Sequence, residues 1–328
     1  MSIVHSVACF VAVLLPVFMT SCVSPRDPAV VALVEAVQVQ RLRADITALT
    51  RSGPRAPSHL PGTRAAVAYL KSELSTAGYE VTEERVGRSV ATPDGEYPFV
   101  NVVAELRGLT PGAPILELGA HYDTVSASVG ADDNASGVAG VLEIARVLGG
   151  VRPEKTIRFC FFCLEEYGLH GSAYHAEQIL ARGEPVEGIL VFEMIGYSSD
   201  EPSSQETPVR IPLLVWPPTT GDFITVVGNL SSGGLGNLFE SVADRYVPDL
   251  KYYSVNRLGG FFSDSARSDH SQYWSRGLRG IMITDTANFR NPHYHEETDT
   301  AETLDFEFMR RVTQAGLAAV SEWALIQR

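Results

Sequence analysis

Histidine, aspartate and glutamate side chains recur in this sequence where hydrophobic, strand-like stretches end. They are His121 with Asp123, Glu165 with Glu166, Glu193, and His295, which follows shortly after the last such stretch. A single His or Glu after a strand is usually a solvated loop residue. Four strands that deliver such residues to one place instead indicate a metal site, and imidazole and carboxylate donors without a thiolate suit zinc.

The segments that must position these residues alternate between strand and helix. Strand-like patterns cover 79–86, 101–108, 115–120, 156–164, 188–192, 223–228 and 280–286, and helical patterns cover 27–50, 63–77, 135–148, 171–181, 235–247 and 304–326. Such alternation predicts an α/β fold, a mostly parallel twisted sheet with helices on both faces. Ligands bind at the carboxyl ends of the strands in such sheets, where the acidic residues and histidines fall. The polar, Pro-rich segment 198–221 is interpreted as a long loop near the site.

The stretch His121 to Gly137, HYDTVSASVGADDNASG, contains two adjacent aspartates, Asp132 and Asp133. Either could be a ligand, and spacing alone does not choose between them. The doubled Glu165 and Glu166 allow one carboxylate to bind metal while its neighbour transfers protons. The sequence contains no H-E-x-x-H and no G-x-S-x-G, which excludes a helix-borne zinc protease site and the usual serine-hydrolase elbow.

The ordered motifs HYDTV, GADDNASG, LEEYGLHGS, FEMIGY, SDHSQYW and NPHYHEETDT resemble those of the bacterial zinc aminopeptidases. That family also includes glutamate carboxypeptidase II, glutaminyl cyclase and the catalytically silent transferrin receptor. The resemblance extends from about Arg55 to the C-terminus and implies the zinc exopeptidase fold with two zinc ions per chain. The ligands that it implies are His121 and Glu193 for the first zinc, Asp133 as the bridge, and Glu166 and His295 for the second.

The resemblance also implies roles for residues beside the ligands. Asp123 would orient His121 from behind, and Glu165 would be the general base and acid. Glu193 departs from the best-known members, which carry Asp at that position. Tyr294 stands where some members have an oxyanion-binding tyrosine, although a packing aromatic is an equally good interpretation. The family pattern places the bridge on Asp133, which makes Asp132 a neighbour whose removal should be survivable.

Other candidates have plainer interpretations. His270 is expected near the substrate pocket, and Asp299 is expected either to support His295 or to cap the last helix. Cys160 and Cys163 are expected to be core residues on opposite sides of a buried strand. Surface or loop positions are expected for the remaining histidines of the motif region, His170, His175 and His293.

The N-terminus predicts export. The apolar run from Ile3 to Met19 has the length of a signal-peptide core, and Met19-Thr20-Ser21-Cys22 resembles a lipoprotein cleavage box. We expect a signal peptide over 1–22 with a possible lipid anchor at Cys22, an N-terminal helix and linker over 23–54, and the catalytic domain over 55–328. The expected location is the periplasm or the outer membrane, with a plain secretory signal or an uncleaved anchor as alternatives.

Composition restricts the partners. The 328 residues carry a formal net charge of −13, which argues against a nucleic-acid partner because phosphate binding depends on Lys and Arg. The leading hypothesis is an aminopeptidase that hydrolyses N-terminal residues from peptide substrates with a zinc-activated hydroxide. The alternatives are a carboxypeptidase or glutaminyl cyclase on the same fold, or a non-catalytic, lipid-anchored binding protein. Membrane contact is expected only through the possible anchor.

Overall fold

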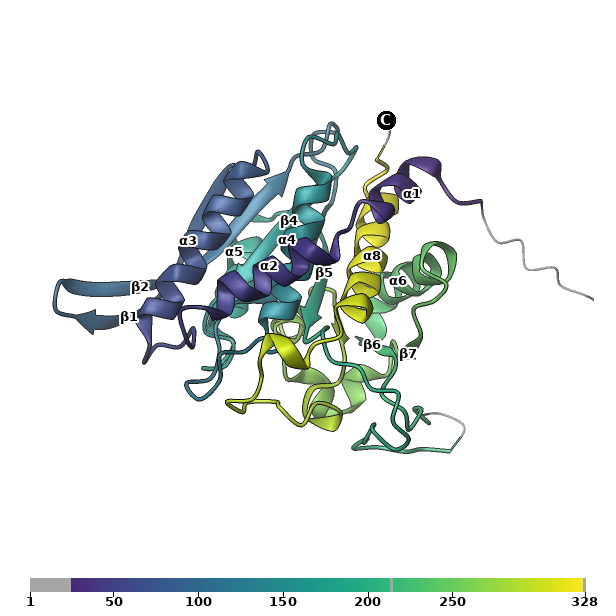
Figure 1. The fold of residues 1–328 in the computed structure, drawn as a ribbon. Helices are drawn as coiled ribbons and strands as arrows, with labels where there is room; N and C mark the ends of the chain where they lie inside the picture. Colours follow the sequence, from purple (N-terminus) through teal and green to yellow (C-terminus); the bar gives the residue numbers. More distant parts are fainter. Residues whose placement is uncertain (1–24, 213–214, 327–328) are drawn as a thin grey trace, which may run out of the picture.

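A computed structural model describes residues 25–212 and 215–326, which form one eight-stranded sheet with helices on both faces (Figure 1). The strand order is β1-β2-β4-β3-β5-β8-β6-β7. The strands are β1 (Val81–Thr92), β2 (Gly95–Leu106), β3 (Ile115–His121), β4 (Thr156–Phe162), β5 (Val186–Glu193), β6 (Ile224–Gly228), β7 (Tyr252–Val255) and β8 (Gly280–Thr284). The helices are α1 (Pro28–Glu35), α2 (Val39–Thr50), α3 (Leu60–Thr76), α4 (Ala135–Leu148), α5 (His170–Arg182), α6 (Gly233–Tyr246), α7 (His270–Trp274) and α8 (Phe306–Trp323). Short 3₁₀ turns are η1 (Leu230–Ser232), η2 (Gly259–Phe261), η3 (Ser263–Ala266), η4 (Ala287–Phe289) and η5 (Ala301–Thr303).

The centre of the sheet is parallel, as the alternating pattern predicted. Strand β3 pairs in parallel with β4 and β5, and β5 pairs in parallel with β8. The antiparallel pairs flank this centre, where β2 meets β1 and β4, and β6 meets β8. The central strands are buried along almost their whole length because both of their faces are covered.

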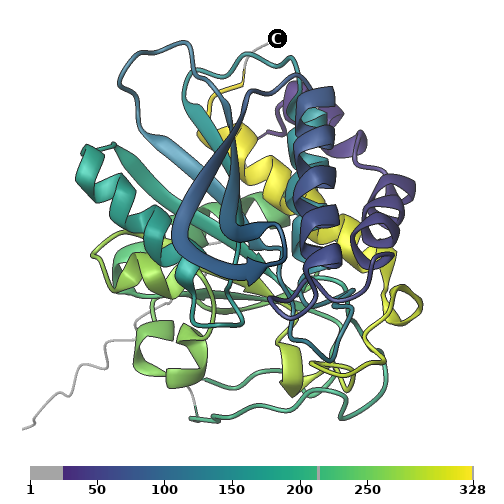
Figure 2. The same ribbon diagram turned by 90° about the vertical axis from the view of Figure 1, so that its left-hand side faces the viewer.

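The two faces of the sheet carry separate cores. Helices α3, α4, α6 and α8 cover one face, with α1 and α2 packed on α4 and α8, while α5 and α7 cover the other (Figure 2). Cys160 belongs to the α5–α7 core and Cys163 to the opposite core. Both are buried free thiols, which confirms that they are packing residues.

Several elements differ from the pattern-based expectation. The single helix expected over 27–50 is two helices, because the backbone N–H of Gln38 donates to Glu143 Oε1 at 2.8 Å instead of continuing the helix. The first two strands are longer than expected and form the extended β1–β2 hairpin. The short strand β7 and the short helix α7 were not expected. Segment 198–221 is a loop, as predicted, in its described part.

The predicted signal peptide and Cys22 lie outside the described residues, so export stays a prediction. Within residues 25–212 and 215–326, no helix combines the length and the apolar character that crossing a membrane requires.

Candidate metal centre

The five predicted metal ligands and the predicted general base, Glu165, meet at one edge of the sheet. His121 ends β3, Glu193 ends β5, and Glu165 and Glu166 follow β4 within four residues. Their donor atoms form two groups, within each of which all atoms lie within 4.8 Å of one another. One group is His121, Glu165 and Glu193, and the other is Asp133, Glu166 and His295.

Asp133 joins the two groups. Its Oδ1 lies 3.4 Å from His121 Nε2, and its Oδ2 lies 3.1 Å from His295 Nε2. His121 Nε2 is also 3.4 Å from Glu193 Oε1, and His295 Nε2 is 3.1 Å from Glu166 Oε2. One carboxylate that faces both histidines has the geometry of a bridge between two cation sites.

Asp123 holds this edge together from behind. Its Oδ1 and Oδ2 accept hydrogen bonds from the backbone N–H groups of Glu165 and Glu166, at 3.0 and 3.2 Å, and Oδ1 lies 3.6 Å from His121 Nδ1. The nearer partner of His121 Nδ1 is the backbone carbonyl of Asp123, at 3.2 Å. Asp123 therefore orients the ring of His121 through its carbonyl, while its buried carboxylate fixes the turn that carries the glutamate pair.

The local sequence places Asp133 against Glu193. Asn134 caps helix α4 by accepting from the N–H of Gly137 at 3.0 Å, and its Nδ2 donates to the carbonyl of Phe192 at 2.8 Å. A Cβ on Gly137 would lie 2.3 Å from that same carbonyl, so only glycine allows this approach. The N-terminus of α4 is thus bound to the end of β5.

Asp132 is buried and belongs to neither donor group. The expectation that its removal is survivable stays a prediction, and the contacts of its side chain argue against it. Its Oδ1 accepts from the N–H of Gly196 at 2.9 Å and its Oδ2 from Asn291 Nδ2 at 2.7 Å, all in the buried interior. Loss of this side chain would leave both donors without a partner.

Asp299 takes neither of the two roles expected for it. Its Oδ1 and Oδ2 accept from the backbone N–H groups of Asp132 and Asp133, at 2.8 and 3.1 Å. The cap of helix α8 is Asp305, whose side chain accepts from Glu307 and Phe308. Asp299 therefore fixes the backbone of the bridging aspartate rather than supporting His295.

Two residues at the site were not identified from the sequence. Arg55 is fully buried, and its guanidinium donates to the carbonyls of Tyr122, Val129 and Gly130 at 2.5, 2.6 and 2.8 Å. It thereby holds both ends of the loop between His121 and Asp133. A lone arginine within the Pro/Gly-rich stretch RSGPRAPSHLPG was the available signal.

The second is Ser268, whose hydroxyl donates to Glu193 Oε2 at 2.7 Å. It lies in the motif for which His270 was singled out. His270 itself is buried and is not among the residues that line the pocket described below. Its ring packs edge-on against Trp274, and its Nε2 lies 2.7 Å from the carbonyl of Ser265, so it supports the pocket wall from behind.

The expectation of a surface position is wrong for His175, which is buried on α5. Its Nδ1 lies 2.7 Å from Glu84 Oε2 and its Nε2 lies 3.2 Å from Glu117 Oε1. Glu117 also accepts from Arg158 and Tyr273, at 2.8 and 2.6 Å. Because the carboxylate oxygens of Glu117 are already hydrogen-bonded, this is an internal ion-pair network and not a second metal site. His170 and His293 are partly exposed, as expected.

The charges at the sheet edge favour a bound cation. Burial, reinforced by the charge of Asp133, raises the pKa of Glu166 to about 7, and burial with neighbouring carboxylates raises the pKa of Glu165 well above its usual range. The pKa of His295 rises to about 10, because the carboxylates of Asp133 and Glu166, each 3.1 Å from its Nε2, outweigh the effect of burial. Glu166 Oε1 is buried without a hydrogen-bond partner. The closely spaced carboxylates of both groups, and the oxygen of Glu166 that has no hydrogen-bond partner, fit the binding of metal ions at both groups.

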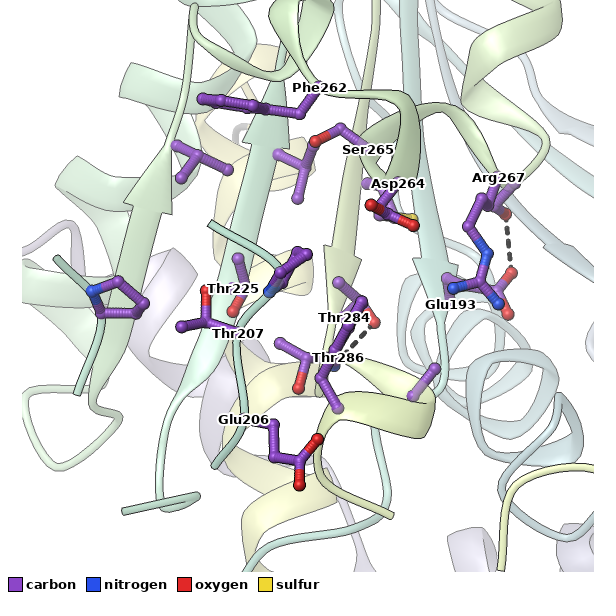
Figure 3. A pocket seen from close by; sticks show the side chains of 18 of the residues that line it. Glu193, Glu206, Thr207, Thr225, Phe262, Asp264, Ser265, Arg267, Thr284 and Thr286 are labelled. Atoms are coloured by element: carbon purple, nitrogen blue, oxygen red, sulfur yellow. Dashed lines mark hydrogen bonds between the residues drawn. The ribbon is translucent and has the colours of Figure 1, made fainter. Parts of the chain in front are cut away.

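A pocket of about 320 Å³ opens beside these acids (Figure 3). Its floor is the face of β6, β7 and β8 that carries Thr225, Val227, Tyr253, Val255, Met282 and Thr284. Loop segments 205–209, 215–217 and 262–268 cover it, adding apolar side chains such as Val209, Val215 and Phe262. The pocket is therefore mostly apolar inside and acidic at the metal-binding edge.

Tyr294 stands between pocket and acids. Its ring stacks on that of His295 with 3.8 Å between centroids, and its hydroxyl accepts from Arg267 Nη2 at 3.1 Å. It lines the pocket, so both a packing role and contact with substrate are compatible with its place.

Comparison with known proteins gives the class. Residues 101–320 match the model of peptidase family M28, and the chain belongs to this family. That result confirms the resemblance carried by the motifs.

Individual relatives agree over most of the chain. The chain is 35% identical over 290 residues to the uncharacterized protein YfbL of Escherichia coli, which covers 83% of this chain and 84% of that protein. It is 28% identical over 334 residues to a probable zinc metalloprotease of Leptosphaeria maculans, covering 90% and 75%. The crystal structure of the LapA aminopeptidase of Legionella pneumophila superposes with a TM-score of 0.73 at 21% identity, covering 90% and 74%, and shares the fold.

Proposed function

We propose that this M28 peptidase is a zinc-dependent aminopeptidase that binds two zinc ions. The observation that carries the proposal is the pair of donor groups joined by Asp133, which lies beside an apolar pocket large enough for an amino-acid side chain. The names of two similar proteins, a probable zinc metalloprotease and an aminopeptidase, support the same metal and the same reaction.

The chain's own donors divide between the two ions. His121 and Glu193 would hold one, Glu166 and His295 the other, and Asp133 would contact both. Zinc at these positions would supply Lewis-acid activation of a water molecule and of the substrate carbonyl. The longer side chain of Glu193 is fixed by Ser268, which leaves its other oxygen, Oε1, directed at His121.

Glu165 is the general base and acid of the proposal. It is grouped with His121 and Glu193, and its backbone is fixed by Asp123. Its carboxylate takes a proton from the attacking water as the new C–O bond forms, and then gives that proton to the amine when the C–N bond breaks. The products are a free amino acid and a peptide shortened by one residue.

The remaining groups position the substrate. The apolar pocket takes the side chain of the N-terminal residue, and the carboxylates of Glu165 and Glu193 attract its free ammonium group. The hydroxyl of Tyr294, which lines the pocket, would donate a hydrogen bond to the oxygen of the attacked carbonyl.

The test is hydrolysis of leucine p-nitroanilide by protein loaded with zinc. We expect turnover that a chelator abolishes and zinc restores, with two equivalents of metal bound. Glu165→Gln should keep both metals and lose at least about 100-fold in kcat, in line with the loss of a general base. Glu96→Gln, on the exposed end of the β1–β2 hairpin, is the matched control. A zinc-loaded protein that cleaves no substrate with a free N-terminus would exclude the proposal.

A further inference from the structure

The pocket has one cationic side chain among the described residues that line it. Six carboxylates line the same space, those of Asp133, Glu165, Glu166, Glu193, Glu206 and Asp264. The single guanidinium belongs to Arg267, which lies beside Glu193 and across the site from Thr207 and Thr225 (Figure 3). A lone cation in so acidic a surrounding needs an explanation.

Arg267 is held by neutral groups only. Its Nη1 donates to Asn288 Oδ1 at 2.8 Å, and its Nη2 donates to the hydroxyl of Tyr294 at 3.1 Å. Among the described residues, no carboxylate oxygen comes within 4.0 Å of the guanidinium. The side chain is thus fixed in position, while its charge is not neutralised by the protein.

We infer that Arg267 binds a carboxylate of the substrate on the leaving-group side of the cleaved bond. This inference rests on the proposed function and narrows its substrate class to short peptides. A planar guanidinium matches a carboxylate with two parallel hydrogen bonds, which an ammonium group cannot do. Arg267 lines the same pocket beside Glu193 and contacts Tyr294, the residue proposed to bind the attacked carbonyl oxygen, so a short leaving group that starts at that carbonyl comes close to the guanidinium.

Reach restricts the length of the peptide. Arg267 contacts Tyr294, and Tyr294 stacks on His295, so the guanidinium is one aromatic side chain away from the donor groups. Each further residue lengthens an extended chain by about 3.3–3.6 Å. The terminal carboxylate of a dipeptide or tripeptide can therefore lie at Arg267, whereas the terminus of a longer peptide passes beyond it.

Two kinds of carboxylate could bind there, the C-terminus or an acidic side chain of the second residue. Three substrates distinguish them: Leu-Gly, its C-terminal amide, and Leu-Glu amide. For the wild type we expect kcat/KM for Leu-Gly to exceed that for Leu-Gly amide by about tenfold, mainly through KM. That ratio corresponds to about 1.4 kcal/mol, a modest value that suits an exposed guanidinium. Equal rates for Leu-Glu amide and Leu-Gly would assign the side chain as a second source.

Arg267→Gln should bring the ratio of Leu-Gly to its amide close to one, and Arg267→Lys should leave an intermediate ratio. Loss of the contact with Tyr294 would slow both substrates equally, so the ratio isolates recognition of the carboxylate. Arg107→Gln, at an exposed arginine far along the sheet, should keep the wild-type ratio. An unchanged ratio in Arg267→Gln would overturn the inference.

Binding gives a second readout that does not require turnover. In zinc-loaded Glu165→Gln protein, calorimetry should show tighter binding of Leu-Gly than of its amide, and the additional Arg267→Gln change should remove the difference. If the wild type cleaves none of the peptides, the proposed aminopeptidase function fails while this binding comparison still decides the role of Arg267. Equal Kd values for the two peptides in the Glu165→Gln protein would refute it.

Discussion

Asp299 fixes the backbone of Asp133 although 166 residues separate the two in the sequence. The Oδ2 atom of Asp299 accepts from the N–H of Asp133 at 3.1 Å, and its Oδ1 accepts from the neighbouring Asp132 at 2.8 Å. The carboxylate that joins the two donor groups is therefore positioned through its main chain by the segment that follows His295.

This relationship predicts a metal-binding defect for Asp299→Ala. Removal of the acceptor frees the backbone of Asp133, and outer partners of metal ligands typically contribute 10–100-fold to affinity. We expect zinc affinity, measured by competition with a chromogenic chelator, to fall by about that factor. Glu297→Ala, an exposed acidic residue two positions away, should bind zinc as the wild type does. Wild-type affinity in Asp299→Ala would show that the backbone of Asp133 is fixed by other contacts.

Alanine substitutions of the two adjacent aspartates should have different effects, one on zinc binding and the other on stability. Asp133→Ala removes the shared donor, so it should lose bound zinc while the metal-free protein keeps a melting temperature near that of the metal-free wild type. Asp132→Ala removes a buried acceptor of two hydrogen bonds and should lower the free energy of unfolding by about 2–4 kcal/mol. Denaturant unfolding of both metal-free variants tests this, and equal stability would contradict the assignment of Asp132 to the interior.

Arg55 should be needed for the stability of the protein. Arg55→Met leaves three carbonyls of the loop 122–130, two of them on buried residues, without their charged donor, which we expect to cost about 3–5 kcal/mol in the free energy of unfolding. Arg55→Lys keeps the charge but cannot reach all three carbonyls, so its stability should fall between Arg55→Met and the wild type. If chemical denaturation gives Arg55→Lys the same free energy of unfolding as the wild type, the loop requires the positive charge and not the several N–H donors of the guanidinium.

The ion-pair network around His175 predicts a pH-dependent stability. Carboxylates and a thiol face the imidazole and raise its pKa well above 6.5 despite burial, while the hydrogen bond to His175 helps to lower the pKa of Glu84 against burial. The stabilisation that protonated His175 contributes is therefore present below about pH 6.5. It is lost as the pH rises through the higher pKa that His175 has in the folded protein. The pKa values of Glu84 and Glu117 are lowered in the folded protein. The stabilisation that these two carboxylates contribute is therefore lost only below about pH 4.5. The groups that face His175 and its partners are Cys160, Glu84, Glu117, Arg158, Arg182 and Tyr273.

His175→Gln should consequently lose most stability, relative to the wild type, between about pH 4.5 and 6.5. The difference in melting temperature should shrink as the pH rises above 6.5. Above that pH the folded wild type still holds the proton on His175, and its unfolding releases that proton, whereas the variant has no such proton to release. Thermal unfolding of both proteins in matched buffers from pH 5 to 9 measures this. A difference that stays constant over that range would mean that folding does not shift the pKa of His175, and a difference that grows as the pH rises to about 6.5 would mean that the folded protein holds His175 neutral.

The sequence was informative wherever local pattern decides structure. Alternating apolar segments predicted the sheet and its helices, and acidic residues at strand ends predicted the metal-binding edge. The break between α1 and α2 was not predictable, because it depends on Glu143, about a hundred residues further along the chain. The roles of Asp299 and Asp132 likewise arise from contacts between distant segments that no spacing encodes.

The burial of His175 also depends on contacts between distant segments and could not be predicted from the local sequence. On helix α5 it lies among polar residues, HGSAYHAEQ, and looks like a solvated histidine. It is buried because Glu84 of β1 and Glu117 of β3 approach the same face of the sheet and supply the charges that a buried imidazolium needs.

The order of strands in the sheet separates reactivity from selectivity. His121, Glu165, Glu166 and Glu193 come from β3, β4 and β5, and only His295 follows β8, whereas the pocket floor comes from β6, β7 and β8. Substitutions on β6 and β7, which carry no donor, can therefore alter which side chain is accepted without moving a donor atom. Protein engineering could therefore replace the pocket residues as a unit to change the substrate specificity. Natural relatives could diverge in specificity by the same route while the catalytic reaction stays the same.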